Sequence, residues 1–174
     1  VLAEVDGKAA QSSMRFNLLN YETYGESYDP IRILESVRKY INDLKIHPND
    51  VVLISSTVEL LEPLNEALNL TEKTKVTFED SAEIDALPHA VREDPESLKD
   101  EIDRIRRRKK SFFTQNSGLI KLSTIHSFKG LESQTVFCIL APGDDAEMVY
   151  TGITRAQSNL VVFDTSSSKY RSFF

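Results

Sequence analysis

The stretch that decides the fold is Ile120-Lys-Leu-Ser-Thr-Ile-His-Ser-Phe-Lys-Gly-Leu-Glu-Ser-Gln-Thr-Val-Phe-Cys-Ile-Leu140. In its first part Ile120 and Leu122 alternate with polar neighbours, which predicts a strand that runs out of a core. Its last part, Val136 to Leu140, is continuously apolar, as in a strand covered on both faces of a sheet. The segment between them is polar. Open α/β sheets bind ligands at the carboxyl ends of their strands, so we expect a functional loop here.

The composition of the 174-residue chain fits one globular domain over residues 1–174, with 40% hydrophobic and 28% charged residues. No apolar run approaches the ~20 residues that span a bilayer, so we expect no membrane partner. The acidic start lacks the basic region of a secretory signal. With the single Cys138, this favours a reducing, cytoplasmic location. The absence of a methionine at Val1 suggests a fragment of a longer protein.

The net charge of −6 argues against a free-standing nucleic-acid binder, although a narrow DNA track needs only a few residues. The charge is also uneven along the chain. Residues 79–103 are acidic, and residues 104–110 form the one basic block. That block suits either a DNA backbone or the carboxyl end of a helix beside the acidic stretch. We favour the second interpretation.

The predicted elements follow a strand–helix rhythm that favours parallel pairing with right-handed crossovers. Residues 1–13 form a lead-in, residues 20–29 a loop, and residues 169–174 a short helix or tail. Proline after a capping residue starts two helices, at Asp29-Pro30 and Asp94-Pro95. The expected helices cover residues 30–44, 57–68, 95–110 and 146–156. The expected strands are Met14–Leu19, Val51–Ile54, Lys75–Phe78, Leu119–Ser123, Val136–Leu140 and Leu160–Phe163.

Two motifs carry a resemblance to a known family. Thr124-x-His126-x-x-Lys129-Gly130-Leu131-Glu132 resembles the fifth signature motif of UvrD/Rep/PcrA-type superfamily 1 DNA helicases. Val149-Tyr-Thr-Gly-Ile-Thr-Arg-Ala156 resembles their sixth. Two motifs in the right order, each beside a strand, are more specific than either alone. The resemblance implies a C-terminal RecA-like domain, a three-layer α/β/α fold with a mostly parallel sheet that lacks the P-loop.

The sequence has no G-x-x-x-x-G-K-[ST] motif and no apolar strand that ends in Asp-Glu. The chain alone therefore cannot cradle phosphates and metal as a P-loop enzyme does. One cysteine and three scattered histidines give no metal-ligand spacing, so we expect no metal site in this chain. The resemblance implies ATP with Mg²⁺ in a cleft shared with an N-terminal RecA-like domain of the same parent chain, which holds the metal.

By the same resemblance, Arg155 is the candidate catalytic residue, because its planar charged fork suits a transferring phosphoryl group. Glu132, Gly130 and Lys129 belong to the nucleotide site with it, the glutamate binding the ribose. Thr124 and His126 match positions that contact single-stranded DNA. Three alternatives remain: a surface salt bridge for Arg155, an exposed loop acid for Glu132, and a structural histidine for His126. We expect Tyr150 to pack rather than contact a ligand.

The sequence departs from the family in three places. The family's fourth motif carries an arginine where Asn20-Tyr21-Glu22 gives a glutamate, and Arg32 is a possible substitute. The phenylalanine that follows Gly-Leu-Glu is replaced by Ser133. The large inserted domain is reduced to residues 79–117, with a helix near 95–110. These departures bear on how ATP hydrolysis is coupled.

Our hypothesis is the second motor domain of an ATP-dependent DNA helicase that acts on single-stranded DNA in repair, recombination or replication restart. The isolated fragment should then be inactive, because it lacks the Walker motifs. The alternative is a non-catalytic RecA-like module that binds a protein or nucleic-acid partner. A Walker A motif upstream in the same reading frame distinguishes the two.

Overall fold

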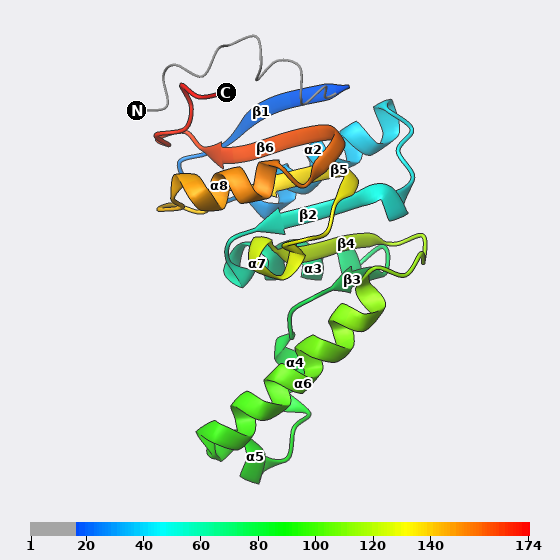
Figure 1. The fold of residues 1–174 in the computed structure, drawn as a ribbon, viewed down its shortest axis with the longest axis vertical. Coiled ribbons are helices and arrows are strands. Elements are labelled where there is room, and N and C mark those ends of the chain that lie inside the picture. The colour runs from blue at the N-terminus through cyan, green and yellow to red at the C-terminus, as the bar shows by residue number, and fades with distance from the viewer. Residues whose placement is uncertain (1–16) are drawn as a thin grey trace.

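The computed structural model describes residues 17–174 and contains one six-stranded sheet in the order β1-β6-β5-β2-β4-β3 (Figure 1). Each neighbouring pair of strands runs in parallel. All described strands therefore begin at one end of the sheet, the amino end, and finish at the other, the carboxyl end. The strands are β1 (Leu18–Gly25), β2 (Val51–Ser55), β3 (Thr74–Val76), β4 (Ile120–Thr124), β5 (Ser133–Ile139) and β6 (Ala156–Thr165).

Helices cover both faces of this sheet, so the predicted three-layer α/β/α fold is confirmed. The helices are α2 (Pro30–Asp43), η1 (Pro48–Asp50), α3 (Val58–Asn69), α4 (Ser81–Asp85), α5 (His89–Glu93), α6 (Pro95–Phe113), α7 (Ile125–Phe128) and α8 (Ala146–Ile153). Helices α2 and α3 pack on one face, and α7 and α8 lie on the other (Figure 1).

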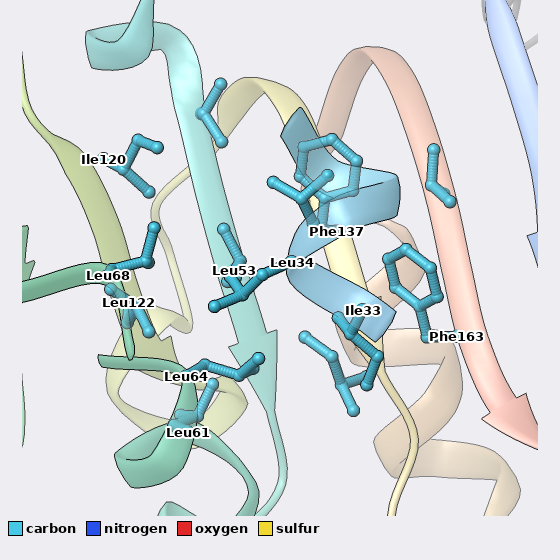
Figure 2. Close-up of a cluster of buried hydrophobic side chains, with 14 of the residues drawn as sticks. Ile33, Leu34, Leu53, Leu61, Leu64, Leu68, Ile120, Leu122, Phe137 and Phe163 are labelled. Carbon is cyan, nitrogen blue, oxygen red and sulfur yellow. The ribbon is translucent and has the colours of Figure 1, made fainter. Parts of the chain in front are cut away.

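Alternate residues of each central strand feed two separate cores. Leu53, Leu122, Phe137 and Phe163 point to the face under α2 and α3, as Figure 2 shows. Their strand neighbours point to the face under α7 and α8. The continuous apolar runs predicted from the sequence arise because both faces are covered.

The first strand was predicted wrongly. It covers Leu18–Gly25, whereas most of this segment was expected to be a loop. The part of the predicted strand before residue 17 and the lead-in at 1–13 lie outside the described residues. Glu22 can lie within this strand because its carboxylate has hydrogen-bond partners. Ser36 donates to its Oε2 at 2.6 Å, and Tyr40 donates to its Oε1. The hydrogen bonds of Glu22 thus come from side chains of α2, a separate element of the fold.

Three further boundaries differ from the prediction. Strand β6 starts at Ala156, four residues before the apolar run, because Asn159 lies beside Thr135 of β5 and donates to its hydroxyl at 2.9 Å. Helix α8 therefore ends at Ile153 rather than at Ala156. Residues 169–174, expected as a short helix or tail, form turns, and Phe174 stacks on Tyr21 at 5.3 Å between ring centroids.

Helices α4, α5 and α6 form an arm, residues 81–113, that projects from the β3 side of the sheet (Figure 1). The predicted helix near 95–110 is present as α6, whereas the treatment of residues 79–117 as an insertion stays a prediction. Arg106 donates two hydrogen bonds to the Glu79 carboxylate, from Nε to Oε2 and from Nη2 to Oε1, each 2.6 Å long. Lys109 contacts Glu83, and Arg104 contacts Glu101. These ion pairs support the interpretation of the basic block as a partner for nearby acids.

No helix within residues 17–174 is both long enough and apolar enough to cross a membrane.

Candidate nucleotide and nucleic-acid site

The candidate residues lie on two short crossovers on one face of the sheet. Strand β4 ends at Thr124, and the chain must return to the amino end before it can start β5 in parallel. Residues 125–132 make this return. Thr124 and His126 consequently lie at the carboxyl end of the sheet, and Glu132 lies at the amino end, next to the start of β5. The expectation of one functional loop at the carboxyl end was therefore wrong for Glu132.

The carboxyl-end part of this crossover is the helical turn α7 rather than a loop. Ile125 and Phe128 are buried beneath it, so the apolar residues hold it on the sheet. Thr124 caps the turn, with its hydroxyl accepting from Ser127 N at 3.2 Å. His126 and Lys129 are exposed. Exposure leaves the His126 ring accessible to a ligand, and its role as a DNA contact stays a prediction.

Gly130 has a φ of +86°, a conformation that side chains other than glycine rarely adopt. A β-carbon built on it would meet nothing within 4 Å. Glycine is therefore required at this position by its backbone conformation and not by close packing. The residue lets the chain turn from α7 toward Glu132.

Arg155 lies in the turn between α8 and β6, at the amino end of the sheet. Its Nε donates to Thr151 O at 3.1 Å, and its Nη2 donates to Thr154 Oγ1 at 3.1 Å. Within residues 17–174, Arg155 forms no ion pair with a carboxylate. The side chain is half-buried and held against α8 by neutral acceptors, so its positive charge is not neutralised by a salt bridge.

Glu132 and Arg155 come together because they precede adjacent strands. Ser133 N donates to Arg155 O at 3.0 Å, which joins the two segments. Gln157 Nε2 donates to Glu132 Oε2 at 3.0 Å, and Gln157 Oε1 accepts from Gln134 Nε2 at 2.7 Å. Sequence reasoning missed Gln157, because its contact depends on the register between β5 and β6. The result is an exposed carboxylate and a half-buried guanidinium at one end of the sheet.

A cleft of about 220 Å³ separates α7 from α8. His126 and Lys129 line one side of it, while Asp145, Glu147 and Thr151 line the other. Asp145 caps α8, since its side chain accepts from Met148 N at 2.8 Å. Asp145, Glu147 and Thr151 were not predicted as site residues, since their position beside α7 depends on how the two crossovers pack. Thr151, which lines the cleft, also accepts a hydrogen bond from Arg155 Nε through its main-chain carbonyl.

The fourth-motif region does not add a second arginine beside Arg155. Glu22 is bound to α2, as described above. Arg32 is exposed at the start of α2, which packs on the opposite face of the sheet from α8. The expected packing role of Tyr150 is also wrong, because its side chain is 64% exposed on α8.

The chain resembles known proteins in both fold and sequence. The C-terminal domain of a possible DNA helicase from Lactobacillus plantarum shares its fold, with a TM-score of 0.52 and 16% identity, over 87% of this chain and 76% of that one. The parallel sheet and the two crossovers define a RecA-like α/β fold. Residues 119–163 match the family model of the UvrD-like helicase C-terminal domain. The predicted resemblance to the C-terminal RecA-like domain of UvrD-type helicases is therefore confirmed.

One curated relative matches most of the chain. The ATP-dependent DNA helicase HMI1, mitochondrial, of Saccharomyces cerevisiae is 27% identical over 155 residues, which cover 86% of this chain. The chain spans 21% of the length of that relative.

Proposed function

We propose that this chain is the second motor domain of an ATP-dependent DNA helicase and that it completes an ATP cleft opposite an N-terminal RecA-like domain of the same parent. The observation that carries the proposal is that Glu132 and Arg155 lie on neighbouring segments at the amino end of the sheet. The main chains of the two segments are joined by a 3.0 Å hydrogen bond. An arginine without a carboxylate partner among residues 17–174 is available to an anionic ligand.

The chemistry of these two side chains suits the two parts of a nucleotide. The exposed carboxylate of Glu132 is an acceptor for ribose hydroxyls. The guanidinium of Arg155 presents parallel donors to phosphate oxygens. Developing charge on a transferred phosphoryl group is stabilised where such donors are already oriented. Thr151 O and Thr154 Oγ1 orient the Arg155 fork, so little reorganisation is needed when a phosphate arrives.

Bound Mg²⁺ supplies charge neutralisation between the β- and γ-phosphates of ATP in enzymes of this kind. The part of the chain that the structure describes has no group of three or more His, Cys, Asp or Glu residues placed to hold a metal ion. We therefore assign the metal to the N-terminal motor domain. The chain described here contributes the cationic side chain of Arg155 and the ribose-binding side chain of Glu132.

We assign single-stranded DNA to the carboxyl end of the sheet. His126 and Lys129 are exposed there, on the side of the cleft opposite Asp145 and Glu147. Lys129 was expected in the nucleotide site, and we assign it to the DNA end because it lines the same cleft as His126. An imidazole and an ammonium group donate to phosphate oxygens, which position a strand without reading its sequence. Thr124 contributes through its cap on α7, which fixes the orientation of His126. The two ligands thus bind opposite ends of the sheet.

The test is Arg155→Ala in the full-length parent. We expect kcat for ATP hydrolysis to fall by about 10³-fold or more, as for other arginines that stabilise phosphoryl transfer. Affinity for single-stranded DNA should change by less than about twofold, because the DNA end of the sheet is untouched. Arg155→Lys should restore activity only in part, since an ammonium group lacks the planar fork. Steady-state ATPase assays with and without DNA measure these quantities.

His126→Ala is the matched variant at the opposite end of the sheet. It should weaken DNA binding and DNA stimulation while basal hydrolysis stays near that of the parent. The rival function is the non-catalytic module, which is favoured by the absence of a second arginine beside Arg155 among the described residues. DNA-stimulated hydrolysis at the parental rate in Arg155→Ala would make that module the better account.

A further inference from the structure

Gly152 is the point where α8 approaches both β5 and α7. The residue is buried, and a β-carbon built on it would lie 3.0 Å from Cys138 Sγ and 3.0 Å from Ile125 Cδ1. Both of these neighbours are completely buried, so they lack free space behind them. Glycine destabilises a helix interior relative to alanine. We attribute its presence here to the close approach of three elements.

This contact joins the two turns that carry the candidate functional side chains. Arg155 N donates to Gly152 O at 3.1 Å, so the turn after α8 is attached directly to the glycine. On the other side, Ile125 is the first residue of α7 and precedes His126. Close-packed atoms transmit displacement because there is little empty space to absorb it. A shift of α7 at the DNA end is therefore passed to α8 and its Arg155 turn.

We propose that Gly152 is a positioning residue that sets the location of Arg155 and couples the DNA end of the sheet to its nucleotide end. The proposal rests on the function proposed above. An added methyl group would push α8 away from β5 and α7 by a fraction of an ångström. The guanidinium would then be misplaced relative to the transferred phosphoryl group. Reaction rates are sensitive to such a misplacement of a catalytic group.

The experiment uses Gly152→Ala in the full-length parent. We expect DNA-stimulated kcat to fall by about tenfold, since a misplacement of about 1 Å lowers rates by about 100-fold. The KM for ATP and the Kd for single-stranded DNA should stay within about twofold, because no ligand contact is removed. A helix that was merely destabilised would lower the amount of folded protein and leave kcat per folded molecule unchanged.

Rescue provides the specific readout. Ile125→Val removes the Cδ1 atom and Cys138→Ala removes the Sγ atom that the new methyl group would meet. Adding both changes to Gly152→Ala should restore kcat to within about threefold of the parent. The two changes without Gly152→Ala are the matched control, and they should keep DNA-stimulated kcat within the same range. Unchanged kcat in Gly152→Ala, or no recovery in the triple variant, would overturn the proposal.

A second variant covers the case in which Gly152→Ala does not fold. Cys138→Val adds bulk to the strand side of the same contact and leaves α8 unaltered, and it should lower DNA-stimulated kcat in the same way. Parental kcat in that variant would also overturn the proposal. If Arg155→Ala has no effect, the proposed function fails and this inference fails with it. If Arg155→Ala abolishes hydrolysis and Gly152→Ala does not reduce it, only the positioning role is lost.

Discussion

Buried hydroxyl groups near the carboxyl end of the sheet are of two kinds. Thr77 Oγ1 and Ser123 Oγ lie 2.9 Å apart and form a buried hydrogen bond. Ser55 is equally buried, yet its Oγ has no hydrogen-bond partner among the described residues, and neither has Ser56 Oγ. Ser55 pairs in register with Thr124, the cap of α7. The hydroxyl of Ser123 on β4 is therefore hydrogen-bonded, whereas the hydroxyl of Ser55 on the neighbouring strand β2 is not.

This contrast gives a stability prediction. Ser123→Ala should lower the free energy of unfolding of the isolated chain by about 1–3 kcal/mol, because it leaves Thr77 Oγ1 buried without its partner. Ser55→Ala should be neutral or slightly stabilising, because the hydroxyl that it removes is already unsatisfied. Urea unfolding followed by circular dichroism measures both values. Equal losses for the two variants would show that Ser55 has a partner in solution.

The arm is attached to the sheet by charged groups at its base. Glu79 is only 13% exposed, and Arg106 holds it through two hydrogen bonds of 2.6 Å. Burial alone would raise the pKa of Glu79, but the Arg106 hydrogen bonds and charge outweigh it and lower that pKa below its ordinary value of 4.5. Lys109 Nζ adds a bond to Phe78 O at 2.8 Å. The attachment thus depends on an ionised Glu79.

The lowered pKa predicts how the arm responds to pH. A carboxylate whose pKa is lower in the folded state stabilises that state above its unfolded pKa, and the effect is lost as pH falls through the folded pKa. Amide protection factors in α6, which correct for the pH dependence of intrinsic exchange, should therefore fall below about pH 4.5, and Glu79→Gln should already lower them at pH 7. The pair is worth less than about 1 kcal/mol after solvent screening, since Arg106 is half-exposed. A pH response unchanged in Glu79→Gln would exclude this pair as its source.

At the scale of elements, the parts that could be predicted are those with local signals. The apolar run Val136–Leu140 and the caps Asp29 and Asp94 determine their elements through neighbouring residues, and the structure confirms them. Strand β1 could not be predicted, because the partners of Glu22 come from α2. The placement of Glu132 at the amino end could be inferred from the sequence, since the residue lies a few positions before the predicted strand Val136–Leu140. The cleft between α7 and α8 could not be inferred from the sequence, because it depends on how the two helices pack on the sheet.

Under the proposed function, the whole chain presents one half of a nucleotide site. Arg155 and Glu132 approach a ligand from one side only, and residues 17–174 contribute no metal-binding group to the other. Binding energy from half of a cleft leaves the triphosphate in contact with water, where charge interactions are screened. The proposed function therefore implies that activity requires a partner domain that surrounds the phosphates.

The isolated chain should accordingly show no ATPase and no unwinding activity. ATP with Mg²⁺ at about 1 mM should stabilise it by no more than about 0.4 kcal/mol, which corresponds to a Kd of about 1 mM or weaker. Thermal unfolding with and without nucleotide tests this, and the chain refolded with a separately purified N-terminal motor domain is the positive control. DNA-stimulated turnover by the chain alone would contradict the proposed division of roles.

The order of the sheet also determines when each strand can find its partner during synthesis. Among the described residues, β1 pairs only with β6, the last strand of the chain, as in Leu18 with Asn159. Strand β1 leaves the ribosome well before β6, so it has no neighbouring strand until residues 156–165 have emerged. The inner strands β2, β4 and β5 can associate earlier. Contacts so distant in sequence form slowly, and folding of this molecule is therefore completed only when translation of β6 is finished.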